Sequence, residues 1–369
     1  MARQPRALAW LAGLALAILL LASCVQPPAA AVPAARQERI TLRVLMAGSL
    51  IQPFDDLEAA FEQIHPEVDV LMEGHGSIQV IRHVTELREL VDVVASADYA
   101  LLPALMYQST DPETGQPYAD WTIQFATNRL TLAYTDRSLY ADEIDANNWY
   151  EVINRPGVRL GLPDPRFDAA GYRGLMLLQL AEDYYDAPQI FEDTLQGRLR
   201  RPIRTYYEDG RWTIVVPEIV QPVPNSGLIV RGSSVQLIAL LESGDLDYAF
   251  EYESVSRQHG FNYLTLADEL NMGSEALADT YDQVEVQLDF QRFQSVTPVF
   301  GGEFIAYGIT VPSNAPHPQQ AAELVAFLLG PEGQQIMAAN YHPLITPPRV
   351  DHPERLPDVL RGVAVPKEE

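Results

Sequence analysis

Short apolar runs, which are typical of β-strands, alternate along the chain with longer apolar patterns that have helical spacing. We expect strands over residues 40–46, 68–72, 91–95, 129–134, 159–162, 247–252 and 304–311. We expect helices over residues 53–65, 77–90, 171–185 and 235–241, and a helix pair over residues 318–340 that breaks at Gly330-Pro331. This alternation predicts an α/β fold with mostly parallel sheets flanked by helices.

Three stretches follow neither pattern. A loop is expected over residues 111–117, an irregular Pro-rich segment over residues 196–227, and a Pro-rich surface tail that begins near Pro347 and is assigned to residues 349–369. The chain has 369 residues, which is more than one domain of ordinary size. Two domains are therefore expected.

The first 24 residues have the pattern of a bacterial lipoprotein signal peptide. Arg3 and Arg6 precede an apolar run over residues 7–22, which is shorter than the roughly 20 apolar residues that a spanning helix prefers. The run ends at Cys24, the only cysteine of the sequence and the expected lipidation site, and the Pro- and Ala-rich residues 25–38 are expected to form a linker. We therefore expect an extracytoplasmic protein that a lipid on Cys24 anchors to the outer face of the cell membrane. A permanent transmembrane anchor is the alternative.

The chain is strongly acidic, with 25 basic and 50 acidic residues and a formal net charge of −25. Nucleic-acid binding needs clustered cations that neutralise phosphates, so this class of function is excluded. The sequence has no nucleophile elbow, P-loop or dinucleotide fingerprint, and His65, His75 and His83 lack the close spacing of metal ligands. We expect a monomeric binding protein with no resident cofactor and no catalytic residues.

Small or acidic residues stand between an expected strand and an expected helix in three places. Ser49 follows the strand over residues 40–46, Ser77 follows the strand over residues 68–72, and Asp164 and Asp168 follow the strand over residues 159–162. Helix N-termini present unpaired amides and the positive end of the helix dipole, so such loops can hold an anion without a cationic side chain. The alternative is that these residues are ordinary helix caps.

Motifs spread from about residue 42 to about residue 347 share one family pattern. They are Ala47-Gly48-Ser49-Leu50 with Pro53-Phe54, Gly76-Ser77-Ile78-Gln79, Ser96-Ala97-Asp98-Tyr99, Tyr118-Ala119-Asp120-Trp121, Asn147-Asn148-Trp149-Tyr150, Gly171-Tyr172-Arg173, Phe250-Glu251-Tyr252 with Gln258-His259, and Gly330-Pro331-Glu332-Gly333. On these motifs the chain resembles the archaeal-type tungstate/molybdate-binding proteins of ABC importers. The Gly330-Pro331 helix break is the least specific of them, because many solute-binding proteins have it.

The resemblance implies a two-lobed periplasmic-binding-protein fold of type II that closes over an oxyanion. Lobe I is expected to comprise residues 39–128 and 310–348, and lobe II residues 129–309. By this resemblance Ser49 and Ser77 bind oxygens of the oxyanion, while Asp168 and Glu251 coordinate its metal. The implied partners are tungstate or molybdate and the permease subunit of an ABC transporter.

The family pattern is broken at one point, because Asp168 is followed by Ala169-Ala170 and not by a proline. Asp164, which does precede a proline, is therefore a rival ligand, and Glu253 is a rival to Glu251. Asp168 as a helix cap and Glu251 as a paired core acid are the structural alternatives.

Two carboxylates would also select the anion. In a partly desolvated cleft a carboxylate repels sulfate or phosphate by on the order of 4 kcal/mol per pair of unit charges near 4 Å. Molybdenum and tungsten are large enough to accept two further oxygen ligands, so the same carboxylates would attract these anions. The alternatives are the same fold with ferric iron, sulfate or phosphate as its ligand, and a secreted hydrolase that uses paired carboxylates across a cleft.

Overall fold

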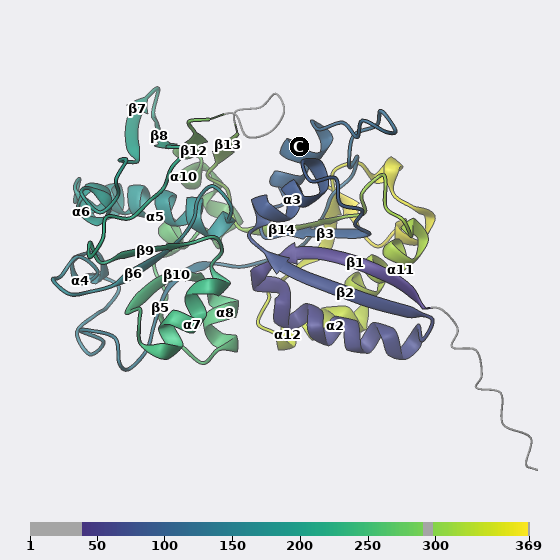
Figure 1. Cartoon of the computed structure of the whole chain (residues 1–369), viewed down its shortest axis with the longest axis horizontal. Coiled ribbons are helices and arrows are strands. Elements are labelled where there is room, and N and C mark those ends of the chain that lie inside the picture. The colour runs from purple at the N-terminus through teal and green to yellow at the C-terminus, as the bar shows by residue number, and fades with distance from the viewer. Residues whose placement is uncertain (1–38, 291–297, 368–369) are drawn as a thin grey trace, which may run out of the picture. The chain divides into compact units, whose positions relative to one another are not determined.

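The computed structural model describes residues 39–290 and 298–367 (Figure 1). The expected signal peptide, its Cys24 and the linker over residues 25–38 lie outside the described residues. Within the described ranges, no helix combines the length and the apolar character that crossing a membrane requires.

Seven strands form the largest sheet, in the order β16-β15-β4-β14-β3-β1-β2. Their bounds are β1 Ile40–Ala47, β2 Val68–His75, β3 Val93–Ser96, β4 Ile123–Thr127, β14 Ala306–Thr310, β15 Leu344–Val350 and β16 Val365–Pro366. Strand β1 pairs in parallel with β2 and β3, whereas β14 is antiparallel to β3 and β4. The helices of this part are α2 Ile51–Ile64, α3 Ser77–Thr85, α11 Pro318–Leu329 and α12 Pro331–Ala339.

The remaining strands form two smaller sheets, one of five strands in the order β11-β5-β10-β6-β9 and one of four in the order β13-β12-β8-β7. Their bounds are β5 Leu130–Tyr134, β6 Leu160–Pro163, β7 Arg204–Glu208, β8 Arg211–Val216, β9 Leu228–Arg231, β10 Tyr248–Tyr252, β11 Asn262–Leu264, β12 Val284–Leu288 and β13 Val299–Gly301. The helices are α4 Trp149–Val152, α5 Ala169–Tyr185, α6 Ile190–Leu195, α7 Val235–Ser243, α8 Glu253–Gln258, α9 Asp268–Asn271 and α10 Ala278–Tyr281. Helix α5 contacts strands of both smaller sheets, and its residues are buried from Ala169 to Glu182.

Short helical turns complete the described elements. They are η1 Gly48–Leu50, η2 Leu102–Tyr107, η3 Glu275–Leu277, η4 Pro353–Arg355 and η5 Asp358–Leu360.

The chain passes twice between the large sheet and the smaller sheets, once from β4 to β5 and once from β13 to β14. Figure 1 draws the large sheet and its helices on one side and the two smaller sheets on the other. The first passage lies between Thr127 and Leu130, and the second lies before Ala306, because β14 already belongs to the large sheet. We therefore propose lobe boundaries that follow the sheets, with the second boundary moved from residue 310 to a position between Gly301 and Ala306.

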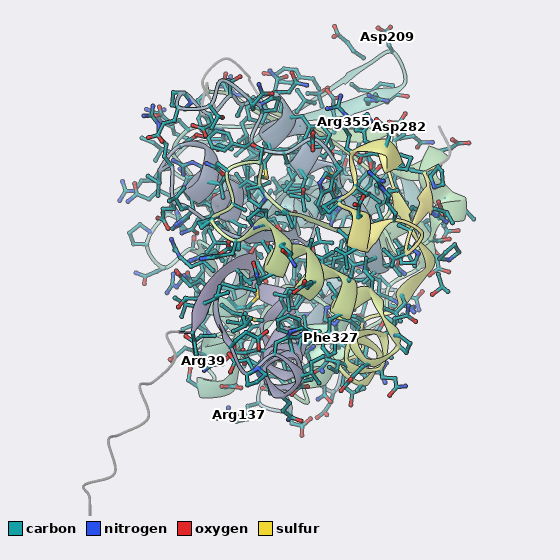
Figure 2. All side chains as sticks on the ribbon, turned by 90° about the vertical axis from the view of Figure 1, so that its right-hand side faces the viewer. Arg39, Arg137, Asp209, Asp282, Phe327 and Arg355 are labelled. Atoms are coloured by element: carbon teal, nitrogen blue, oxygen red, sulfur yellow. The ribbon has the colours of Figure 1, made fainter. Side chains whose placement is uncertain are left out.

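Two of the expected elements are wrong in their extent. Helix α3 ends at Thr85 and not near residue 90, and the chain turns at Arg88, whose φ is 57°. The segment over residues 196–227 is not irregular throughout, because β7 and β8 form a hairpin within it. Strand β7 is mostly exposed, so it has no apolar run, although the Asp209-Gly210 turn is a recognisable hairpin signal. This hairpin, with Asp209 at its tip, projects from the described body (Figure 2).

The expectation of an irregular tail beyond Pro347 is also wrong in part. Strand β15 continues to Val350, and β16 pairs with it in parallel at the edge of the large sheet. The N–H of Lys367 donates to the Val350 carbonyl at 2.7 Å, and its Nζ donates to the Tyr99 hydroxyl at 2.5 Å while lying 4.3 Å from the centroid of the Tyr99 ring. The end of the described chain is thus attached beside the loop that follows β3.

Candidate functional site

Five polar residues lie where strands of the two lobes end or adjoin helices. Ser49 follows β1 and Ser77 begins the helix after β2, so both come from the large sheet. Asp168 follows β6, Ser234 follows β9, and Glu251 lies near the end of β10, so these three come from the five-stranded sheet. Ligands of open α/β sheets bind outside the carboxyl ends of the strands, which is where these residues stand.

The two lobes approach each other closely on both sides of these residues. A Cβ atom at Gly76 would lie 2.4 Å from the Phe167 carbonyl oxygen, and one at Gly48 would lie 2.8 Å from a methyl group of Val235. The same Phe167 carbonyl accepts hydrogen bonds from the amides of Ile78 at 3.0 Å and Gln79 at 3.3 Å. Two amides at the start of α3 are thus used by the protein itself, contrary to the expectation that they are unpaired.

Asp168 is a helix cap and also a buried acid next to a second carboxyl group. Its side chain accepts from the amide of Ala170 at 2.9 Å as the N-cap of α5, and from the amide of Ser234 at 2.9 Å. Burial raises the pKa of Asp168 to about 6, although these two amides and the Arg173 guanidinium act in the opposite direction. Only 5% of the residue is exposed. Each carboxylate oxygen accepts one amide, and its second lone pair remains for a ligand, so capping and a second role are compatible.

Glu251 is the more strongly perturbed of the two carboxyl groups. Its Oε1 accepts from the amide of Tyr252 at 2.8 Å, whereas its Oε2 is buried and accepts no hydrogen bond from any residue that the structure describes. Burial raises the pKa of Glu251 to about 8, and the neighbouring Asp168 adds to the increase. The side chain of Ser234 acts in the opposite direction. Ser234 thus contacts both Asp168 and Glu251. The two carboxyl groups come from the same lobe and lie near each other.

The two candidate anion-binding serines are both buried, and the hydroxyl of each contacts a polar group of the protein. The Oγ of Ser77 accepts from the amide of Ala97 at 3.0 Å, and the Oγ of Ser49 lies 2.8 Å from the hydroxyl of Tyr307. The structure therefore brings Ser49 to Tyr307, on β14, and Tyr307 lies close enough to Glu251 for this carboxyl to raise the pKa of the tyrosine. Ser234 thus links Asp168 with Glu251, Tyr307 contacts Ser49, and Ser77 is held separately by the Ala97 amide.

A buried ion pair joins the two lobes. Arg173, on α5, lies 3.1 Å from Asp98, which follows β3, and also donates to the Ala97 carbonyl at 2.8 Å and the Tyr252 hydroxyl at 3.1 Å. Tyr172 donates to the same carboxylate of Asp98. Burial lowers the pKa of Arg173, but Asp98 and the tyrosine hydroxyls raise it by more, so the guanidinium stays charged. This buried cation lowers the pKa of Asp168.

The two rival acids are engaged by arginines. Both oxygens of Asp164 are bound by Arg166, at 2.8 Å and 2.5 Å, and Glu253 forms an ion pair with Arg129 at 2.8 Å. Neither rival leaves an unpaired buried oxygen of the kind found on Glu251.

The sequence did not predict three further residues of this region. Ser234 contacts Asp168, Tyr307 contacts Ser49, and Asn128 contacts Tyr307. Ser234 had the same signal as Ser49 and Ser77, since it stands between a strand and the helix over residues 235–241. Tyr307 and Asn128 had no local signal, because their partners lie 258 and 179 residues away along the chain.

The sequence matches the family described as bacterial extracellular solute-binding proteins over residues 42–341. The chain belongs to this family. Among the relatives of this solute-binding protein, an uncharacterized solute-binding protein of Methanoculleus marisnigri is 42% identical over 84% of this chain and 83% of its own length. The molybdate/tungstate-binding protein WtpA of Thermococcus kodakarensis is 37% identical over 85% of this chain and 84% of its own. WtpA of Pyrococcus abyssi is 35% identical over 90% of this chain and 92% of its own.

Solved structures of periplasmic binding proteins share the fold of this solute-binding protein. The periplasmic molybdate-binding protein of Azotobacter vinelandii superposes with a TM-score of 0.53 at 12% identity, covering 82% of this chain and 99% of that one. The sulfate-binding protein SubI of Mycobacterium tuberculosis superposes with a TM-score of 0.52 at 12% identity, covering 84% and 88%. The predicted two-lobed α/β fold is thereby confirmed, whereas identities this low carry no information on the ligand.

Proposed function

We propose that this solute-binding protein captures tungstate or molybdate outside the cytoplasm and delivers the anion to the permease of an ABC transporter. The observation that carries the proposal is the pair of buried carboxyl groups, Asp168 and Glu251, which meet at Ser234. The pair leaves Oε2 of Glu251 without a hydrogen-bond partner among the described residues.

Two adjacent acids in a buried site are unfavourable unless a positive centre lies between them or a proton is retained. Burial raises the pKa values of Asp168 to about 6 and of Glu251 to about 8, so the surrounding protein supplies too little positive charge to hold both groups as carboxylates at neutral pH. The metal of a tungstate or molybdate ion is an electrophilic centre that carboxylate oxygens can coordinate. The sulfur of sulfate and the phosphorus of phosphate do not extend their coordination in this way, so these anions would meet only repulsion.

The relatives support the same ligand class. The two proteins named WtpA, at 37% and 35% identity, are described as binding molybdate and tungstate. The structure adds the arginine partners of Asp164 and Glu253, which favour Asp168 and Glu251 as the two metal ligands.

The finer assignments belong to the proposal as well. Ser49 and Ser77 donate hydrogen bonds to the anion's oxygens, from the lobe that faces the two carboxylates. A lipid on Cys24 holds the protein at the outer face of the membrane, where it works as a monomer. A hydrolase with carboxylates on opposite walls of a cleft is disfavoured, since both carboxyl groups come from the five-stranded sheet.

Calorimetric titration of the purified protein with tungstate, molybdate, sulfate and phosphate tests this function. We expect tight binding of the first two anions and none of the last two at comparable concentrations. Equal binding of all four anions would contradict the coordination argument.

The variant Asp168→Asn tests the site within this function. Asn caps a helix about as well as Asp, so the fold should keep its stability while tungstate binding falls and sulfate binding does not. Asp164→Asn is the matched control, because Asp164 is paired with Arg166 and should be dispensable for binding. Loss of binding in the control alone would move the ligand by four residues, to Asp164.

A further inference from the structure

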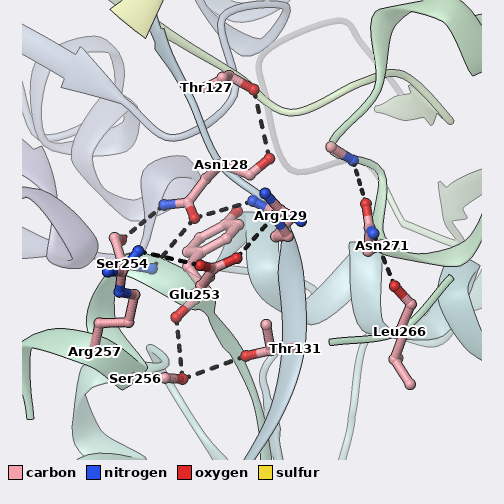
Figure 3. Close-up of polar contacts among 12 residues, drawn as sticks. Thr127, Asn128, Arg129, Thr131, Glu253, Ser254, Ser256, Arg257, Leu266 and Asn271 are labelled. Carbon is pink, nitrogen blue, oxygen red and sulfur yellow. Dashed lines mark hydrogen bonds and ion pairs between the residues drawn. The ribbon is translucent and has the colours of Figure 1, made fainter. Parts of the chain in front are cut away.

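Asn128 lies on the first passage between the lobes and makes four hydrogen bonds with its side-chain amide (Figure 3). Its Oδ1 accepts from the backbone amides of Arg129 at 3.0 Å and Ser254 at 3.4 Å. Its Nδ2 donates to the Ser254 hydroxyl at 2.8 Å and to the Tyr307 hydroxyl at 3.0 Å. Because backbone N–H groups can only donate, they identify the oxygen of the side chain and thereby fix the orientation of the amide.

The orientation of Asn128 determines the direction of the next hydrogen bond. The Tyr307 hydroxyl accepts from Asn128, which leaves its own proton for another acceptor. Among the described residues, the other polar atom in contact with this hydroxyl is Oγ of Ser49, at 2.8 Å. Burial raises the pKa of Tyr307 far above its ordinary value, so the tyrosine keeps this proton. The direction of donation is therefore from Asn128 to Tyr307 and from Tyr307 to Ser49.

Ser49 consequently accepts a hydrogen bond from inside the protein and keeps its own proton for another partner. Ser77 is held in the same way, because the Ala97 amide donates to its Oγ at 3.0 Å. A serine hydroxyl can donate or accept, and an anion without protons can only accept. A serine whose lone pair is already used by the protein is thus oriented to donate to an anion.

We propose that Asn128 and Tyr307 form a hydrogen-bond relay that holds Ser49 as a donor and so makes the site selective for a fully deprotonated oxyanion. Neither residue touches the ligand in this scheme, so both are positioning residues. The inference rests on the proposed function, since it takes Ser49 as a ligand of the anion. In this scheme a crossover asparagine, far from Ser49 in sequence, contributes to anion affinity.

The variant Asn128→Asp reverses the relay without removing its geometry. An aspartate still accepts the amides of Arg129 and Ser254, but it accepts from the Tyr307 hydroxyl as well. Tyr307 then accepts from Ser49, and the serine turns its lone pairs toward the anion. We expect the tungstate affinity of this variant to fall by about 100-fold while the protein retains a cooperative unfolding transition.

The added charge could weaken anion binding by itself, so the variant is combined with Tyr307→Phe. This change removes the hydroxyl and cuts the relay, and Asn128→Asp then acts through its charge alone. We expect Asn128→Asp to cost at least about tenfold less affinity in the Tyr307→Phe background than in the wild-type background. An equal cost in both backgrounds would refute the relay.

A second cycle covers the case in which Asn128→Asp does not fold. Tyr307→Phe should weaken tungstate binding in the wild-type background. In the Ser49→Ala background it should have no further effect, because the serine hydroxyl that Tyr307 orients is no longer present. Independent effects of the two changes would overturn the inference. Titration of the wild-type protein distinguishes the two proposals: binding of tungstate with independent variant effects contradicts only the relay, and no binding of any of the four anions contradicts both.

Discussion

Removal of the Glu251 carboxyl should change how the stability of the ligand-free protein depends on pH. Burial, with a contribution from Asp168, raises the pKa of Glu251 to about 8 in the folded chain, from an ordinary value of 4.5. Between these two values the folded chain retains a proton that the unfolded chain has lost. The free energy of unfolding therefore falls as the pH rises, by up to 2.303RT, or about 1.4 kcal/mol, per pH unit.

The magnitude is the difference between the wild type and a Glu251 variant from pH 6.5 to pH 8, because burial raises the pKa of Glu182 to about 7 and this group contributes to both proteins there. Below this window His342 acts in the opposite direction, because burial lowers its pKa to about 4. The unfolded chain then binds a proton that the folded chain excludes, so this histidine makes stability rise with pH up to about pH 6.5. Within the window Glu251 should lower the free energy of unfolding by roughly 1.5 kcal/mol.

Urea unfolding of the wild type and of Glu251→Gln at a series of pH values measures the effect. The variant keeps an acceptor for the Tyr252 amide, and its stability should fall less steeply with pH than that of the wild type. Glu253→Gln is the matched control, since Glu253 is paired with Arg129, and it should keep the wild-type slope. Parallel curves for the wild type and Glu251→Gln would refute the argument that burial keeps a proton on Glu251.

Three further outcomes are expected. Gly76→Ala should weaken tungstate binding more than it lowers the free energy of unfolding, because the new Cβ would lie 2.4 Å from the Phe167 carbonyl oxygen when the lobes are in contact. Gly301→Ala, with open space at its Cβ, is the control. Calorimetry measures the binding of both variants, and urea unfolding measures their stability. Saturating tungstate should raise the unfolding temperature, because binding to the folded form adds roughly 2.7 kcal/mol at a hundredfold excess over Kd, and an unchanged temperature in a calorimetric scan would count against binding. Cys24→Ser should leave the protein unprocessed or move it from the membrane to the soluble fraction on cell fractionation, with tungstate binding unchanged, whereas a variant that stays lipidated would contradict the anchor.

The parts of the site that follow from local chemistry could be predicted from the sequence. Ser49, Ser77 and Asp168 each stand between an apolar strand pattern and a helix, and the structure has a strand before and a helix after each of them. The helix break at Gly330-Pro331 was likewise visible, because a proline begins a new helix more readily than it continues an old one.

The parts that depend on distant contacts could not be predicted. Tyr307 contacts Ser49, Asn128 contacts Ser254, and Arg173 contacts Asp98, and each pair is far apart in sequence and is brought together only by the tertiary fold. The strands of the β7–β8 hairpin were missed for a different reason: most of β7 is exposed, so no buried face imposes an apolar pattern on it.

The attachment of Lys367 to Tyr99 has a practical consequence. Lys367 is the only lysine in the sequence. A dye coupled to side-chain amines at alkaline pH would therefore enter the folded body at one position, without any engineered residue. That position touches Tyr99, whose neighbour Asp98 holds Arg173 of the other lobe. The fluorescence intensity of an environment-sensitive dye at this position should change when the lobes move relative to each other. The natural sequence therefore already has a labelling site for a fluorescence assay of anion binding.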